Sequence, residues 1–165
     1  YRALERAGKK GILVVVAAGN SGENNDTVDS PTYPASYDLP NLIAVAATNI
    51  HNEILPISNY GANKVHVAAP GEGIFSTMPK GKYGYNTGTS QATAFVSGVA
   101  ALLLSENPNL SPEELKKIII NSVDKAPNLK SRVASGGRLN AYKAVLLAKE
   151  SLKAPSRSVA NASSH

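Results

Sequence analysis

Three short runs of almost purely apolar residues limit what this chain can fold into more than any other feature of its sequence. The runs are ILVVVA at residues 12–17, LIAVAA at residues 42–47 and the shorter VHVA at residues 65–68, and each is bounded by Gly, Pro, Asn or Ser. A run of this length without polar alternation is typical of a strand buried on both faces, as in parallel sheets. The three runs therefore predict an α/β fold with a mainly parallel sheet.

Helices are expected to flank this sheet, because the second half of the sequence changes to a helical period. A helix predicted from about Ser90 to Glu106 is apolar almost all round, so it should lie in the core. Ser111, followed by Pro112 and two glutamates, is typical of the capped start of a second helix that runs through about Ser122. Asn140 can cap a third helix, and residues 2–8 have the pattern of a helix end.

Composition excludes several classes of function. The 165 residues are 42% apolar, and the longest apolar stretch, at residues 98–104, is far shorter than a membrane span. The 17 Lys and Arg against 12 Asp and Glu give a net charge of +5, but the basic residues are dispersed, so neither a nucleic-acid partner nor a membrane is expected. With no Cys and three scattered His, no catalytic metal centre is predicted.

The sequence is interpreted as one part of a larger domain. Residues 1–150 are assigned to this domain, and residues 151–165 are expected to form a polar, disordered tail. The chain starts inside a helical pattern without Met or a capping residue, so we expect it to be a piece of a longer protein. The loop from Ser21 to Pro40 is long enough that a compact domain would usually keep it for a function.

A loop of small residues, NTGTSQA at residues 86–92, places Ser90 in the first turn of the long apolar helix. Unpaired backbone N–H groups and the positive end of the helix dipole lie there, and both stabilise the oxyanion that forms when a hydroxyl attacks a carbonyl. Ser90 is therefore a candidate nucleophile. The same pattern also fits a serine that only caps the helix.

A second candidate residue follows the first buried strand, where AAGNSG occupies residues 17–22. Ligands of α/β proteins bind at the carboxyl ends of parallel strands, so Asn20 could donate a hydrogen bond to a substrate oxygen there. An Asn in such a place can also simply satisfy its own turn. Neither segment decides the function alone.

Together the two segments resemble the subtilisin-like serine proteases, over residues 11–149. The nucleophile signature of that family is similar to GTSQATAFVSG at residues 88–98, and AAGN at residues 17–20 resembles the segment that carries its oxyanion-hole Asn. Further similar stretches are YPA at 33–35, where a cis proline is usual, IAVAA at 43–47, VAAPG at 67–71 and GGRLNA at 136–141. The resemblance implies that Ser90 is the nucleophile, that Asn20 is an oxyanion donor, and that Ala17, Ala18 and Gly19 line the specificity pocket.

The sequence departs from the family pattern in two ways. Gln91, Ala94 and Phe95 replace the usual Met, Pro and His, and we expect them to alter packing around the site without abolishing the chemistry. More importantly, the family's catalytic Asp and His precede the Asn segment in chain order, and neither of their motifs is present. His51, His66 and His165 match no catalytic position and are expected to be solvated or structural.

The resemblance thus implies the C-terminal half of a subtilisin-like domain: a serine endopeptidase that acts on polypeptides, whose Asp and His come from a missing N-terminal part or separate chain, or from a second copy. This chain alone should be inactive or nearly so. Two alternatives remain. One is a non-catalytic relative that binds or regulates. The other is a small-molecule α/β binding domain, and the absence of phosphate-binding glycines from this sequence argues against it. The resemblance also implies secretion and allows a structural calcium ion, although Asp26, Asp29 and Asp38 fit no metal-binding spacing.

Overall fold

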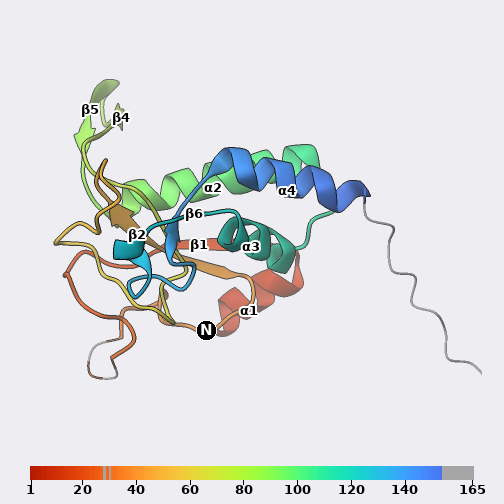
Figure 1. Cartoon of the computed structure of the whole chain (residues 1–165), viewed down its shortest axis with the longest axis horizontal. Helices are drawn as coiled ribbons and strands as arrows, with labels where there is room; N and C mark the ends of the chain where they lie inside the picture. Colours follow the sequence, from red (N-terminus) through yellow and green to blue (C-terminus); the bar gives the residue numbers. More distant parts are fainter. Residues whose placement is uncertain (28, 30, 154–165) are drawn as a thin grey trace, which may run out of the picture.

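The three apolar runs form neighbouring strands, as predicted, at one end of a five-stranded sheet. The computed structural model describes residues 1–27, 29 and 31–153, and Figure 1 shows their arrangement. In chain order the elements are α1 (Arg2–Lys9), β1 (Val14–Ala17), β2 (Leu42–Thr48), β3 (Val67–Pro70), β4 (Ile74–Met78), β5 (Lys82–Asn86), α2 (Thr89–Glu106), α3 (Pro112–Asn121), β6 (Asp124–Lys125), the 3₁₀ turn η1 (Pro127–Leu129), β7 (Gly137–Arg138) and α4 (Ala141–Lys153).

The sheet has the order β1-β2-β3-β7-β6, and its first four strands run parallel. Only the short β6 pairs antiparallel, with β7. Every residue of β2 is buried, which fits a central strand covered on both faces. The α/β fold with a mainly parallel sheet is therefore confirmed.

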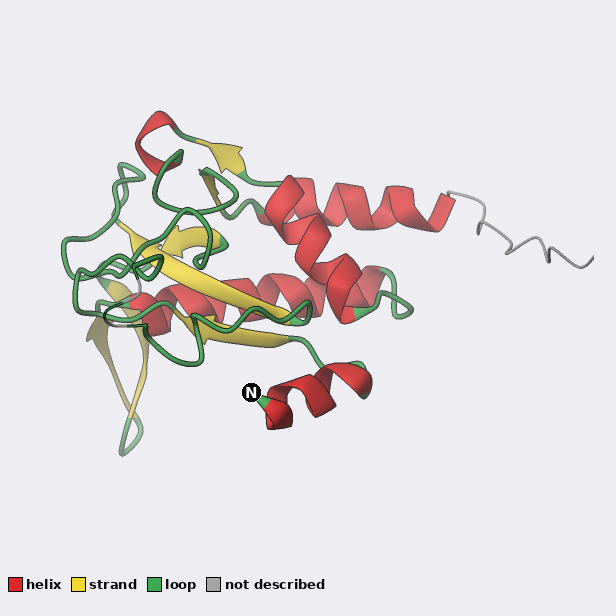
Figure 2. Ribbon diagram, turned by 90° about the horizontal axis from the view of Figure 1, so that it is seen from below, coloured by secondary structure: helices red, strands yellow, loops and turns green. Residues whose placement is uncertain are grey.

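Alternate residues of β2 pack in two different layers, and Figure 2 shows the helices arranged around the strands. Ile43, Val45 and Ala47 pack in one core with apolar residues of α2, α3 and α4. Leu42 and Ala44 pack on the opposite face with the loop at residues 35–39 and with Leu4 of α1. Helices therefore flank the sheet on both sides, and α2 lies directly across β1, β2 and β3.

The predicted helix starts are close to the observed ones. α2 begins one residue before Ser90, and α3 begins with a capping box in which the Ser111 and Glu114 side chains bond to each other's backbone N–H. Two hydrogen bonds from Ser111 hold the pKa of Glu114 below its usual value. α4 runs to Lys153, so the first three residues of the expected tail, 151–153, are helical, and residues 154–165 lie outside the described part.

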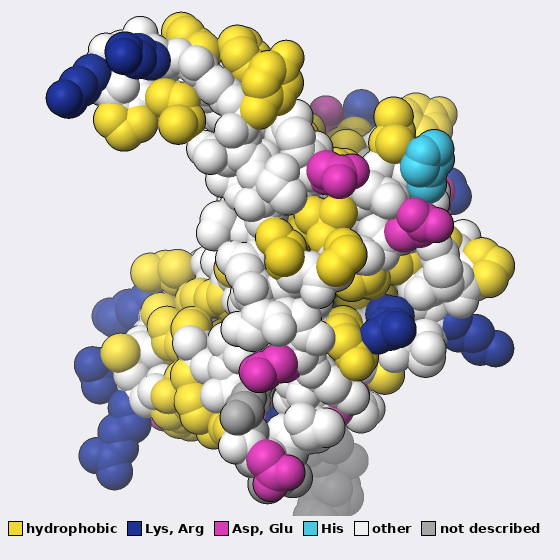
Figure 3. Space-filling view, turned by 90° about the vertical axis from the view of Figure 1, so that its left-hand side faces the viewer, with side chains coloured by type: hydrophobic (Ala, Val, Ile, Leu, Met, Phe, Trp, Pro, Cys, Tyr) yellow, Lys and Arg dark blue, Asp and Glu magenta, His cyan; other side chains and the backbone are white. Residues whose placement is uncertain are grey.

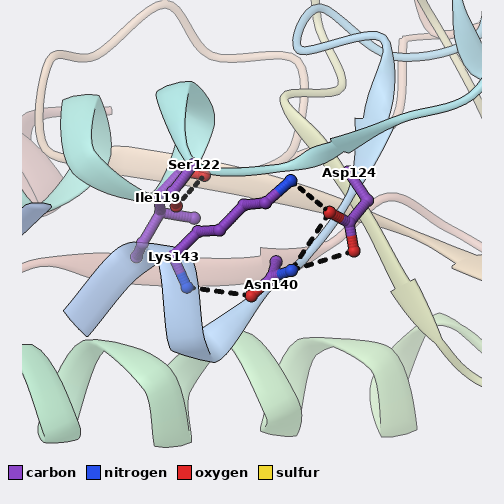
Figure 4. Close-up of polar contacts among 5 residues, drawn as sticks. All are labelled: Ile119, Ser122, Asp124, Asn140 and Lys143. Atoms are coloured by element: carbon purple, nitrogen blue, oxygen red, sulfur yellow. Dashed lines mark hydrogen bonds and ion pairs between the residues drawn. The ribbon is translucent and has the colours of Figure 1, made fainter. Parts of the chain in front are cut away.

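Asn140 immediately precedes α4, and its side chain connects the start of this helix to strand β6 (Figure 4). Its Oδ1 accepts from the N–H of Lys143 at 2.9 Å, as expected of a cap, and its Nδ2 donates to the carboxylate of Asp124 at 2.9 and 3.0 Å. Lys143 Nζ also lies 2.7 Å from that carboxylate. The hydrogen bonds from Lys143 and Asn140 hold the pKa of Asp124 below its usual value.

The hairpin of β4 and β5 was not predicted from the sequence. Its two strands pair antiparallel, and Figure 3 shows hydrophobic side chains gathered on it where it projects from the body. Phe75, Tyr83 and Tyr85 contact one another there, although each is more than half exposed. In β4, IFSTM, apolar and polar residues do not alternate regularly, whereas in β5, KYGYN, Tyr83 and Tyr85 alternate with other residue types and lie on the same face as Phe75.

Two surfaces of the described residues are uncovered. β1 lies at the end of the sheet and pairs only with β2, so its outer edge offers unpaired backbone groups. On α2, Phe95, Leu102 and Leu104 are exposed beside the buried stripe, and a Cβ added to Gly98 would meet no atom within 4 Å. No described helix is long and apolar enough to cross a membrane.

Candidate active site

The candidate residues come together where the parallel strands end. Asn20 follows β1, and Gly71 follows β3 in the adjoining part of the sheet. The N–H of Gly88, the residue that caps α2, donates to the carbonyl of Gly71 at 2.8 Å. This bond places the first turn of α2, with Ser90 in it, at the carboxyl edge of the sheet.

The Asn20 side chain is fixed at its oxygen end. Its Oδ1 accepts the N–H of Thr89 at 2.9 Å and the Thr89 hydroxyl at 3.0 Å, a contact between residues 69 positions apart. Both partners are donors here, so the atom that faces them is the oxygen. The Nδ2 amide, on a solvent-exposed side chain, accordingly remains available to donate to another group.

Ser90 is the second residue of α2 and is exposed. Its N–H belongs to the first turn, whose donors have no carbonyl partner within the helix, and the positive end of the helix dipole lies at the same place. The Ser90 N–H and Asn20 Nδ2 are therefore two candidate donors at the start of α2, where the Ser90 hydroxyl also lies. Such an arrangement can bind the oxygen of a carbonyl under attack.

Gly88 is required for this closeness. Its φ is +152°, and an added Cβ would lie 3.2 Å from Asn20 Oδ1 and 3.4 Å from Gln91 Oε1. A larger residue at position 88 would push the amide of Asn20 away from the helix start.

The three predicted pocket residues differ in exposure. Ala17 and Gly19 are partly exposed, whereas Ala18 is fully buried and packs with Ala46 and Ala68 of the sheet. Gly19 has a φ of +119°, and a Cβ there would lie 2.5 Å from Asn59 Nδ2. In this structure Ala18 can therefore support the other two residues but not touch a ligand.

A cavity of about 430 Å³ adjoins Ser90 between the hairpin and α2. Gln91, Ala94 and Phe95, the three departures from the family pattern, all line it beside Ser90. On the hairpin side the cavity is lined by Ile74, Phe75, Ser76, Thr77 and Asn86. The departures thus change the walls next to the nucleophile.

The histidines of the described residues lie elsewhere. His66 precedes β3, and its Nδ1 accepts the N–H of Ala44 at 2.9 Å, so its side chain is part of the sheet's hydrogen bonding. Burial, followed by the charge of Lys116, lowers the pKa of His66 to about 4. His51 lies in an exposed turn, and His165 lies outside the described part.

Among the described residues, no group of three or more His, Cys, Asp or Glu could hold a metal ion. Of the three aspartates named in the long loop, Asp26 uses its carboxylate to accept N–H groups of Asn63 and Lys64 at 2.8 to 3.2 Å. This carboxylate fastens the loop to the turn at residues 61–64.

Three further residues that shape the site were not predicted from the sequence. Thr89 orients Asn20, while Asn25 and Asn59 lie behind the pocket segment and bond to its backbone. Thr89 could have been noticed as the neighbour of Ser90. For the two buried Asn residues the sequence contains no signal, because Asn is common in exposed turns.

Known proteins resemble this chain in sequence and in structure. A comparison with protein families matches residues 1–142 to the Subtilase family. Thermitase from Thermoactinomyces vulgaris is 43% identical over 144 residues, which cover 87% of this chain and 48% of thermitase. Subtilisin-like protease 2 from Plasmodium falciparum is 40% identical over 141 residues, which cover 83% of this chain and 10% of that protein.

A solved structure of the subtilase cytotoxin SubAB assembly matches with a TM-score of 0.80 and 34% identity, covering 94% of this chain and 55% of that one. The chain therefore spans about half or less of the length of these relatives. The sequence and structural matches extend over the two segments that meet at Ser90 and Asn20. The chain belongs to the subtilase family of serine proteases.

Proposed function

We propose that this chain carries the nucleophile and the oxyanion donors of a serine endopeptidase that cleaves polypeptides. The observation that supports this most is the contact between Asn20 and Thr89, because it holds Asn20 by its oxygen at the residue next to Ser90 and leaves its Nδ2 free to donate. A domain that only binds a partner has no physical need for that pairing.

In the proposed reaction the Ser90 hydroxyl attacks the carbonyl carbon of the scissile peptide bond. A base takes the hydroxyl proton, and the carbonyl oxygen becomes an oxyanion that accepts from the Ser90 N–H and from Asn20 Nδ2. The C–N bond then breaks, the leaving amine takes up the proton, and water hydrolyses the acyl ester on Ser90. Ala17 and Gly19 would line the pocket for the side chain before the scissile bond, with Ala18 behind them.

The base and its orienting Asp are proposed to come from an N-terminal part of the same protease domain, as a separate chain or as another part of a longer one. Two observations support this. The chain covers about half of the matched subtilase structure, and it exposes both an open strand edge on β1 and an apolar face on α2. Both surfaces would be covered by such a part. Secretion, which the family resemblance implies, belongs to the same proposal, as does a structural calcium ion.

Labelling of the native protein with a fluorophosphonate tests the proposal, with Ser90→Ala as the control. A serine activated by a base should react at Ser90, and intact mass should then show one label on this chain. The same preparation should cleave a casein substrate, and both signals should vanish in Ser90→Ala.

A second polypeptide of similar mass that co-purifies would identify the completing part as a separate chain. A preparation that contains two copies of this chain and labels at Ser90 would assign that part to a second copy. If the native protein shows neither label nor cleavage, the chain serves instead in a non-catalytic domain, and the proposed function is wrong.

A further inference from the structure

The segment that carries Asn20 is held from behind by two buried amide side chains. Asn59 is completely buried and Asn25 is 2% exposed; the Asn25 side chain bonds to the backbone before Asn20, and the Asn59 side chain bonds to the backbone after it. We propose that Asn59 and Asn25 are positioning residues that set where the Asn20 amide lies. This inference rests on the proposed function of Ser90 and Asn20.

Asn59 uses both ends of its side chain. Its Oδ1 accepts the N–H groups of Ser21 at 2.9 Å and of Glu23 at 3.1 Å, and since both partners can only donate, this atom must be the oxygen. Its Nδ2 donates to Asn25 Oδ1 at 3.0 Å and to Thr32 Oγ1 at 3.1 Å. No part of this buried amide is left unpaired.

The network continues to the two residues before Asn20. Asn25 Nδ2 donates to the carbonyl of Ala18 at 2.9 Å, and the backbone N–H of Asn59 donates to the carbonyl of Gly19 at 2.9 Å. Residues 18 and 21 are thus bonded to the two side-chain amides and residue 19 to the Asn59 backbone, while the Asn20 side chain itself bonds to Thr89. The Asn20 backbone is therefore fixed by the network and its side chain by the helix start.

The close fit leaves the segment little freedom. The backbone of Gly19 passes so near to Asn59 that a Cβ there would lie 2.5 Å from its Nδ2. A change in the Asn59 amide is thus transmitted directly to the residue before Asn20. Because a displacement of about 1 Å in a catalytic group can cost about 100-fold in rate, the network should affect turnover and not only folding.

Asn59→Asp is the sharpest test, because it changes one atom. The aspartate keeps the oxygen that faces Ser21 and Glu23 but sets a second oxygen against Asn25 Oδ1, and Asn25 Nδ2 is already committed to Ala18. In the native enzyme we expect kcat to fall about 10- to 100-fold with KM nearly unchanged, and the NMR signals of the Asn20 side-chain amide to shift.

Asn41→Asp is the matched control. Asn41 is also a buried amide, and its Nδ2 donates to the carbonyls of Leu4 and Ile12 at 3.1 Å, but it lies before β2, at the opposite edge of the sheet from Asn20. The Asn41→Asp variant should lower the free energy of unfolding about as much as Asn59→Asp does. It should nevertheless leave the Asn20 signals in place and change kcat by less than about twofold, because it moves no group at the site.

If Asn59→Asp fails to fold, Asn25→Ala replaces it with the same measurements, since it removes the bond to Ala18 while leaving the Asn59 oxygen in place. Unshifted Asn20 signals, or an equal loss of kcat in Asn41→Asp at the same folded fraction, would overturn the inference. If the unsubstituted protein has no peptidase activity, the proposed function fails, and the NMR comparison still decides whether the network positions Asn20.

Discussion

At the scale of single residues, the two ends of the Asn20 amide have separate tasks. The oxygen is used by Thr89, so the nitrogen is the only group with which this side chain can stabilise an oxyanion. The same contact explains why the residue before Ser90 carries a hydroxyl: the Thr89 side chain and backbone both donate to one oxygen.

Replacing Asn20 by Leu, which has the same shape, should therefore lower turnover of the native enzyme with little effect on substrate binding. We expect a loss of about 100- to 1,000-fold in kcat, the size known for this donor in the related subtilisin. Steady-state kinetics on a peptide substrate would measure it. Thr89→Val removes one of the two bonds to Asn20 and should cause a smaller loss; an unchanged kcat in Asn20→Leu would rule out Asn20 as the donor.

The buried His66 leads us to expect a pH dependence of stability that is unrelated to catalysis. The folded protein keeps this imidazole neutral, because burial and Lys116, together with Lys64, lower its pKa to about 4, while Asp38 opposes them. The unfolded chain titrates at the ordinary value of about 6.5 and so binds more protons between these two pH values. The contribution of His66 to the free energy of unfolding should therefore be greatest above pH 6.5 and should decrease as the pH falls toward 4.

The expected loss from His66 is at most about 3 kcal/mol, which urea unfolding between pH 7 and pH 4 can measure. His66→Gln should be less stable at pH 7, because it disturbs the bond to the N–H of Ala44, but it should lose less stability over this pH range. His51→Gln, a change in an exposed turn, is the control and should follow the parent curve. Equal slopes for His66→Gln and the parent would contradict the assignment.

At the scale of elements, α2 carries apolar side chains both in the core and on its exposed surface. Ala92, Val96, Val99 and Leu103 lie in the core, while Phe95, Leu102 and Leu104 face outward, and no charged residue interrupts the helix before Glu106. Helices that are apolar all round are normally buried all round. This is the strongest sign, among the described residues, of a further layer on this side.

A comparison of Leu102→Glu with Leu103→Ala distinguishes the role of the exposed side of α2 from that of its buried side. Leu102→Glu should leave the free energy of unfolding of this chain within about 0.5 kcal/mol, since Leu102 is half exposed, but weaken association with the part that completes the domain. Leu103→Ala, one position along and fully buried, should instead cost about 2–5 kcal/mol of stability. Urea unfolding and analytical ultracentrifugation would measure the two effects, and intact association in Leu102→Glu would refute the covered face.

At the scale of the whole molecule, the sequence predicts the parts that are buried on both sides better than the parts at the surface. The strands at 12–17, 42–47 and 65–68 and the helix at Ser90 were found from hydrophobic pattern alone, because core packing and pattern agree there. The hairpin was missed, since its strands are short and mostly exposed, and only β5, KYGYN, shows an alternation of residue types.

The site was predicted only in part, for a related physical reason. Ser90 and Asn20 lie in segments whose local sequence is distinctive, and the family resemblance joins them. Two features of the site depend on contacts between residues up to 69 positions apart. These features are the free nitrogen of the Asn20 amide and the position of Asn25 and Asn59 behind it. A pattern of neighbouring residues contains no information on such contacts.

The open edge of β1 has a consequence for how the cell must manufacture this protein. A parallel strand with one free side can pair with any exposed strand that it meets, including the same strand of another copy. Where the proposed completing part is a separate chain that covers β1, copies made in excess of it would therefore be lost to aggregation or degradation. The yield of folded protein would be set by the ratio of the two parts, so coupled synthesis from one transcript would suit this fold better than independent supply.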